Sequence, residues 1–418
     1  MKRFFLIILL LPLTLRAQQS VTLADCQRAA EANYPLLGQS ALLQEITDAN
    51  IQKINAIWQP QVYVNAQATY QSEVTSLPIS FPGIEVPELS KDQYKATIDI
   101  SQTLYDGGIS SQQKAIAGQN LAVEMQKVEV DKFKIRDKVD QVYMSILMAD
   151  ARIELMVIAV SDLNTVLSIS KVGGTNGVVS DQQILILQAE IMKTEQQLTE
   201  LKALRDGAIR MMAVLTALPL TSTSVFARPE PAFEGTAMNN QRPELQLYAQ
   251  QRTLAGLQQQ YAEAATLPKV SLFAQGGYGK PGLNFLVDSF STFYMGGIKV
   301  SYPLWTGDTK RRDAKIFGLN SEIIGMQQLQ FEQSINVQSA QYQSDIDKYK
   351  TLISQDDSLV NLRTSILTMA RVQLEQGVIS TKDYILYAKD LDDARINRSI
   401  HDLQLLATKV NYLNTLGK

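Results

Sequence analysis

The chain has 418 residues, a formal net charge of −3 at pH 7 and one cysteine. A nucleic-acid partner would need a basic patch, so this charge argues against one. A lone cysteine cannot form an internal disulfide, so disulfides do not hold this fold together. Cys26 lies well past the apolar leader and follows an aspartate. We therefore interpret it as a helix residue and not as the site of a lipid anchor.

The N-terminus has the pattern of a secretory signal. Lys2 and Arg3 precede an apolar run over residues 4–15, and Ala17 is small enough to precede a cleavage site. This predicts a signal peptide over residues 1–17. A membrane anchor is the alternative, but about twelve apolar residues are fewer than the roughly twenty that a span needs. No other stretch approaches eighteen apolar residues, so entry into a membrane would use strands.

The mature chain is predicted to start with a helix and to continue with a strand hairpin. Thr22 and Asp25 have the spacing of a capping box, and the helical pattern runs to about Ile57. After Pro60 the apolar period changes to two, which predicts a hairpin over residues 60–105 with a long connection at residues 76–90. A second hairpin is expected over residues 268–304.

Each predicted strand has an apolar face and a mostly polar face. The polar faces carry Lys95, Asp99, Lys269 and Lys299, which a water-filled lumen would accommodate. Strands of about ten residues are long enough to cross a bilayer on a tilt. A small soluble sheet packed on helices is the alternative, because alternation is a weak signal. In the membrane interpretation the lipid-facing positions are Val62, Val64, Ile98, Ile100, Val270, Leu272, Ile298 and Val300.

A long helix is predicted after Gly107 and Gly108, over residues 109–172. At 1.5 Å per residue it would be roughly 96 Å long. Its apolar heptads indicate a coiled-coil seam. Five residues that include Gly173, Gly174 and Gly177 are expected to break it before a return helix at 180–218. The seam positions are Leu121, Val128, Ile135, Val142, Ala149, Met156 and Leu163.

This pattern occurs twice. The segment at residues 177–180 recurs at 377–380, and Gly107 recurs as Gly307, an offset of 200 residues; upstream, Pro60 and Pro268 are offset by 208. The chain therefore divides into a first repeat at 18–218, a linker at 219–241 and a second repeat at 242–418. The second repeat is expected to hold helices at 308–376 and 380–416.

The sequence contains no recognisable catalytic or cofactor motif. His401 and Cys26 have no metal-ligand neighbours at a useful spacing. The run at residues 276–279 lies in a strand pattern and lacks the helix that a dinucleotide fingerprint requires. We therefore expect no catalysis, no cofactor and no bound metal.

The order of these elements resembles the TolC family of bacterial outer-membrane efflux proteins. The resemblance is carried by residues 33–35 and 241–245, the strand starts at Pro60 and Pro268, residues 104–108 and 304–307, and the paired Gly-Val-x-Ser segments. It implies a mainly α protein with a β-barrel part, assembled as a homotrimer. Four transmembrane strands and long coiled-coil helices from each protomer would form a twelve-strand barrel continued by a twelve-helix barrel.

By the same resemblance, the glycine-bearing tips would form the periplasmic end. They would contact a periplasmic adaptor protein and an inner-membrane transporter there. The implied contact residues are Gly173, Gly174, Gly177, Val178, Ser180, Gly377, Val378 and Ser380.

Some family members carry acidic residues after the second tip that ring the channel aperture. Asp383 matches the first such position and is our candidate gate residue, while Leu386 stands where a second acid is expected. An ordinary solvated residue in the first turn of a helix is the alternative for Asp383.

The sequence thus predicts an outer-membrane exit duct that passes drugs or other export cargo. A periplasmic adaptor and a structural coiled-coil protein are the alternatives. The duplication and the strand pairs disfavour both.

Overall fold

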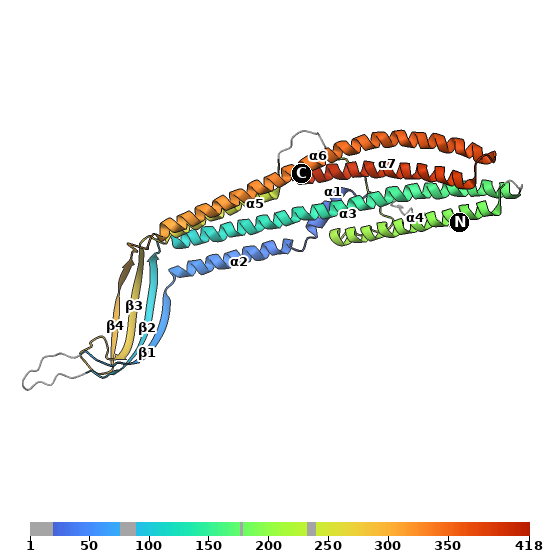
Figure 1. Cartoon of the computed structure of the whole chain (residues 1–418). Coiled ribbons are helices and arrows are strands. Elements are labelled where there is room, and N and C mark those ends of the chain that lie inside the picture. The colour runs from blue at the N-terminus through green and yellow to red at the C-terminus, as the bar shows by residue number, and fades with distance from the viewer. Residues whose placement is uncertain (1–19, 76–88, 176–178, 232–239) are drawn as a thin grey trace, which may run out of the picture. The chain divides into compact units, whose positions relative to one another are not determined.

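The computed structural model describes residues 20–75, 89–175, 179–231 and 240–418 (Figure 1). The predicted signal peptide at 1–17 and parts of the first hairpin connection, the first tip and the linker lie outside the described residues. The chain forms two compact units. Unit 1 comprises Met1–Leu37, Glu129–Pro243 and Phe331–Lys418, and unit 2 comprises Gly38–Val128 and Glu244–Gln330.

Unit 2 contains a four-stranded antiparallel sheet in the order β1-β2-β3-β4. The connection between β1 and β2, residues 71–91, is longer than the one between β3 and β4, residues 281–290. The offset between the copies falls from 208 residues at Pro60 to 200 at Gly107. The longer connection of the first hairpin accounts for this difference. The strands are β1 (Gln61–Tyr70), β2 (Asp92–Tyr105), β3 (Lys269–Lys280) and β4 (Ser291–Ser301).

The prediction of one uninterrupted helix from Thr22 to Ile57 is wrong. The structure has α1 (Leu23–Ala32), α2 (Leu37–Asn55) and the 3-10 turn η1 (Ala56–Trp58). Pro35 lies in the gap, because proline lacks an N–H and disfavours helical backbone in the residue before it. In the second copy the matching Pro243 is the first residue of α5 (Pro243–Ala264), where a missing N–H costs nothing.

The long helices of the two copies are equal in length. The helices α3 (Ile109–Thr175) and α6 (Thr309–Glu375) each have 67 residues. They are followed by α4 (Asp181–Thr216) and α7 (Thr381–Thr415). The helix α3 ends three residues later than expected and includes Gly173 and Gly174, which therefore do not break it.

Gly107 is required where β2 turns into α3. Its φ is +74°, and a Cβ there would lie 2.9 Å from the Cβ of Leu267. Both the backbone conformation and the close approach exclude other residues. Asp106 then caps α3, because its carboxylate accepts hydrogen bonds from the backbone N–H groups of Gly108 and Ser110 at 2.9 and 2.7 Å.

The core of unit 1 joins helices from both copies. One cluster contains four almost fully buried residues, Cys26 of α1, Tyr143 and Ile146 of α3, and Met212 of α4. They pack with residues 403–410 of α7. A second cluster brings together Leu163 of α3, Leu187 and Ile191 of α4, Ala370 of α6 and Tyr384 of α7. The heptad seam predicted for α3 is thus buried in unit 1 at Val142, Ala149 and Leu163, and its residue Val128 is buried in unit 2.

Among the described helices, α3 is long and apolar enough to cross a membrane by length and composition alone. This differs from the prediction that no stretch beyond the N-terminal one is apolar enough for a span. Leu163 and Val166 of α3 are buried against α4, α6 and α7. The apolar character of α3 is therefore used, at least in part, for helix packing within unit 1.

Candidate functional site

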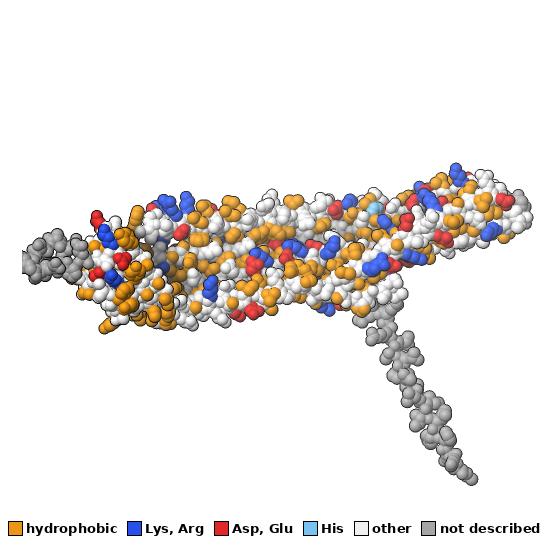
Figure 2. Space-filling model, turned by 90° about the horizontal axis from the view of Figure 1, so that it is seen from below, with side chains coloured by type: hydrophobic (Ala, Val, Ile, Leu, Met, Phe, Trp, Pro, Cys, Tyr) orange, Lys and Arg blue, Asp and Glu red, His pale blue; other side chains and the backbone are white. Residues whose placement is uncertain are grey.

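The predicted lipid-facing residues lie in register across the sheet. Val64 pairs with Ile98, and Leu272 pairs with Ile298. Directly opposed residues share a face in an antiparallel sheet, so the apolar positions of all four strands form one surface. Val62, Val64, Ile298 and Val300 expose between 59 % and 77 % of their surface. Hydrophobic side chains gather over the sheet in Figure 2.

The opposite face of the sheet is mostly polar. Asp99 of β2 accepts hydrogen bonds from Asn65 at 2.6 Å and Thr97 at 2.8 Å, and also from Gln275. Lys95 on the same strand lies 5.1 Å from the ring centre of Phe293. Lys269 and Lys299 occupy this face on β3 and β4. The sheet therefore has one side suited to lipid and one suited to water.

The sheet is open at both edges within one chain. In the order β1-β2-β3-β4, the strands β1 and β4 each have a single neighbour. Among the described residues their outer backbone groups have no strand partner, and such edges are not stable in the hydrocarbon of a bilayer.

The tip between α6 and α7 is built from two complementary caps. Gly377 has a φ of +70°, and the N–H of Val378 donates to the carbonyl of Gln373 at 2.8 Å while the N–H of Gly377 donates to that of Leu374 at 3.0 Å. This pattern is a Schellman motif, which favours glycine at its left-handed position. Val378 is left 66 % exposed.

Ser380 and Asp383 form a capping box at the start of α7. The Asp383 carboxylate accepts from the Ser380 backbone N–H at 3.1 Å and from its hydroxyl at 2.6 Å, and the Asp383 N–H donates back at 3.2 Å. Hydrogen bonds from the Ser380 hydroxyl and then its backbone N–H lower the pKa of Asp383. Its carboxylate is therefore charged at neutral pH and is already engaged in the cap.

The first tip repeats the cap with a neutral residue. Ser180 and Gln183 form the capping box that starts α4. Gly173 and Gly174 lie in the last turn of α3, where a Cβ would approach Val179 and Ile184 at 2.8 and 3.1 Å. Gly177 and Val178 lie outside the described residues.

A ridge of exposed apolar residues runs along α6 and was missed in the sequence analysis. This α6 ridge consists of Ile316, Leu319, Ile323 and Met326, which are 47 % to 67 % exposed and share one helix face. A comparison of the two copies could have found it. Leu319 and Met326 are apolar, whereas the residues at the same positions of the first copy are Gln119 and Gln126.

No metal site is evident in the part of the chain that the structure describes. No group of three or more His, Cys, Asp or Glu residues there could hold a metal ion. Cys26 is buried on α1, and burial raises its pKa to about 11. His401 lies 2.6 Å from Asp356, measured from Nδ1 to the carboxylate.

The profile of the family described as "Outer membrane efflux protein" matches residues 27–216. Over these residues the chain is similar to that family. No curated protein sequence matches the chain.

Solved structures of outer-membrane channels share the fold over almost the whole chain. CusC is 14 % identical, with a TM-score of 0.69 and 94 % of this chain and 91 % of CusC covered. VceC from Vibrio cholerae is 16 % identical, with a TM-score of 0.66 and coverage of 94 % and 96 %. MtrE from Neisseria gonorrhoeae, in its open state, is 15 % identical, with a TM-score of 0.64 and coverage of 94 % and 88 %.

Family and fold together support an exit duct in the outer membrane, with its helices on the periplasmic side. They do not favour a periplasmic adaptor. They also point to a transport role and not to an enzymatic one.

Proposed function

We propose that this protein works as a homotrimeric exit duct for drugs or other export cargo. The observation that carries the proposal is the continuous apolar face across β1–β4, with a polar face behind it. A closed barrel places these two faces toward lipid and toward an aqueous lumen respectively.

The open edges of the sheet support the trimer. Because β1 and β4 run antiparallel, β4 of one copy can pair with β1 of the next. Three copies then close a twelve-strand barrel, as the family resemblance implies, and no edge is left in lipid. The α6 ridge supports the same assembly, since exposed apolar residues at helical spacing are suited to a helix of a neighbouring copy.

The two tips are proposed as the contacts for a periplasmic adaptor and an inner-membrane transporter. The exposed Val378, held by the Gly377 Schellman motif and by Ser380, offers a rigid apolar point for docking. In the first tip the proposed contacts are Gly173, Gly174, Gly177, Val178 and Ser180. The duct itself is proposed to be passive, with energy supplied by these partners.

Membrane fractionation tests the duct proposal most directly. We expect an outer-membrane, heat-modifiable trimer that conducts ions in planar bilayers. A soluble periplasmic pool without such a trimer would contradict the proposal.

Asp383 is proposed as a gate residue in addition to its cap, because three protomers would present three carboxylates at the aperture. Asp383→Gln tests this, because Gln183 already closes the same cap in the first copy. The variant therefore removes the charge and keeps the cap. We expect lower cation selectivity in planar bilayers. Unchanged selectivity would leave Asp383 with the cap alone.

A further inference from the structure

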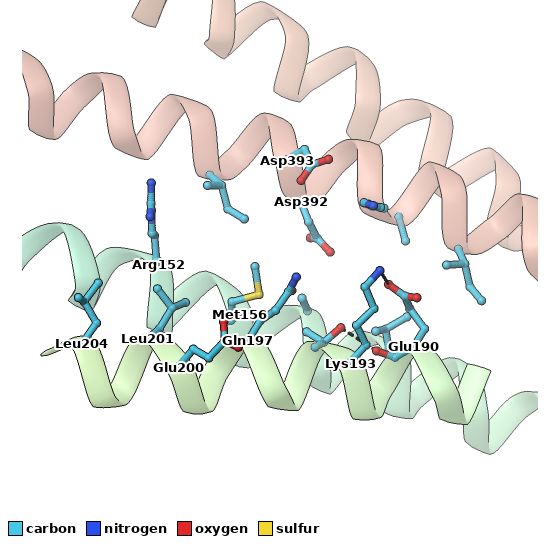
Figure 3. A pocket seen from close by; sticks show the side chains of 17 residues that line it. Arg152, Met156, Glu190, Lys193, Gln197, Glu200, Leu201, Leu204, Asp392 and Asp393 are labelled. Atoms are coloured by element: carbon cyan, nitrogen blue, oxygen red, sulfur yellow. Dashed lines mark hydrogen bonds and ion pairs between the residues drawn. The ribbon is translucent and has the colours of Figure 1, made fainter. Parts of the chain in front are cut away.

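Unit 1 contains a cleft between α3, α4 and α7 that the duct function does not explain. Its volume is about 540 Å³, which is within the range of sites for drug-sized ligands. The cleft lies within one protomer and is lined by residues of three helices (Figure 3).

Much of the cleft wall is apolar. Met156 and Leu163 come from α3, Leu201 and Leu204 from α4, and Ile385 and Ile396 from α7. Leu163 is 7 % exposed, whereas Leu204 is 61 % exposed. The cleft thus has a buried end and an open rim, so an apolar ligand could enter and be desolvated.

One carboxylate in the cleft is both half-buried and without a partner among the described residues. Asp392 of α7 is half-buried and points into the cleft (Figure 3). Across the described residues, its carboxylate has no hydrogen bond and no ion pair. By contrast, Glu190 and Lys193 on α4 pair with each other at 3.6 Å. A desolvated and unpaired carboxylate is a costly group that a ligand cation can stabilise.

Charges of both signs surround Asp392. Arg152 and Asp162 come from α3, Glu190, Lys193 and Glu200 from α4, and Lys389, Asp393 and Arg395 from α7. On α6, Arg363 is paired with Asp390 of α7 at 2.8 Å. Three basic residues line the cleft against four acidic ones, and Asp392 is the one of these seven that is half-buried and has no hydrogen bond or ion pair among the described residues.

We propose that this cleft binds amphipathic organic monocations, with the cationic group at Asp392 and the apolar body against Met156, Leu163 and Leu201. The proposal adds a ligand site in the helical wall to the proposed duct.

The titration of Asp392 gives the site a pH dependence. Burial raises the pKa of Asp392 to about 6. The nearby Arg395 acts to lower this pKa, while Asp162 and Asp393 act to raise it. The carboxylate is charged at pH 7.5 and loses its charge near pH 5. Cation binding should therefore weaken as the pH falls through 6.

The probe is tetraphenylphosphonium, with tetraphenylborate as an anion of the same shape. Both are titrated by calorimetry into the purified full-length protein in amphipol. We expect Asp392→Asn to weaken phosphonium binding by about tenfold at pH 7.5. The wild-type protein should show a similar loss between pH 7.5 and pH 5. The borate should show neither change.

Two further variants keep the test decisive. Asp393→Asn alters the neighbouring exposed carboxylate and should change phosphonium affinity by less than about twofold. Met156→Trp fills the apolar part of the cleft while the Asp392 carboxylate is retained, and it should also abolish tight binding. Equal phosphonium affinity in the wild-type and Asp392→Asn proteins would overturn the proposal. A borate affinity that falls as much as the phosphonium affinity on substitution of Asp392 or on lowering the pH would also overturn it. Because binding is measured without transport, neither outcome depends on whether the protein conducts.

Discussion

The two copies of the repeat share their helix lengths but differ in what those helices bury. The helix α3 contributes a long series of buried residues to unit 1. The equally long α6 buries only Ile335, Ile346 and Ala370 among the described residues. The long helix of the first copy is thus used for packing within the protomer, whereas α6 leaves apolar side chains exposed.

The same contrast holds for polar groups. In the first copy Asp140 is 1 % exposed and accepts hydrogen bonds from Gln27 at 2.7 Å and from Asn414. Its counterpart 200 residues later is Ala340. Burial raises the pKa of Asp140, although both hydrogen bonds act to lower it. One buried polar group of the first copy thus connects α1 and α3 with α7 of the second copy.

The largest expected effect comes from making the α6 ridge resemble α3. Leu319→Gln with Met326→Gln introduces the residues found at 119 and 126 in the first copy. Each apolar side chain contributes about 1.5–3 kcal/mol when fully buried, and the change is repeated in every protomer. We expect the trimer to dissociate, as measured by native mass spectrometry. Glu322→Gln, an exposed polar change on a neighbouring face, should keep the trimer, and a trimeric double variant would show that the ridge does not bind another copy.

The next effect concerns the buried polar group of the first copy. Asp140→Ala leaves the amides of Gln27 and Asn414 without an acceptor, and we expect unfolding to become easier by about 1–3 kcal/mol. Asp140→Asn keeps an acceptor and should cost less. Urea unfolding followed by circular dichroism measures both variants, and equal stability of the two would contradict the role assigned to the hydrogen bonds.

A smaller effect is expected at the second tip. Gly377→Ala places a Cβ on a left-handed residue, with a φ of +70°, and should cost about 1 kcal/mol. Gly325→Ala on α6 is the matched control, because a Cβ there meets no atom within 4 Å and helix propensity favours alanine by up to about 1 kcal/mol. Hydrogen exchange at the tip measures the first change. Unchanged protection there would show that the Schellman glycine is not needed.

The smallest effect is the pH dependence of stability at Asp392. Because the pKa is raised to about 6, the folded state binds the proton more tightly than the unfolded state, and stability increases as the pH falls through 6. Asp392→Asn should therefore stabilise the protein at pH 7.5 by about 1 kcal/mol, allowing for solvent screening. It should have little effect at pH 4.5. Parallel urea titrations at the two pH values check this. If Asp392→Asn changed the free energy of unfolding by the same amount at both, the titration of Asp392 could not be the cause of the change.

Local patterns predicted the hairpins, the long helices and the glycine tips. Alternation in β1–β4 and the heptads of α3 depend on neighbouring residues, so one sequence is sufficient to find them. The helix break at Pro35 was not predicted, because helical patterns continue on both sides of it. The caps at Ser180 and Ser380 also depend on residues that are close in the sequence.

The remaining features depend on residues far apart in the chain. Asp140 is 113 residues from Gln27 and 274 from Asn414, so no local pattern joins them. The cleft around Asp392 requires α3, α4 and α7 together. Asp383 was found as an acid near the tip, but its use in a capping box became clear only from the hydrogen bonds of Ser380.

The equal length of α3 and α6 limits how this protein can be lengthened or shortened. Both helices have 67 residues and lie between a glycine turn after a strand and a tip. Adding one heptad to α3 alone would shift its tip by roughly 10 Å relative to the tip of α6. A functional longer duct would therefore need the same insertion in α3, α4, α6 and α7. The lengths of the long helices in the two repeats can therefore change only together.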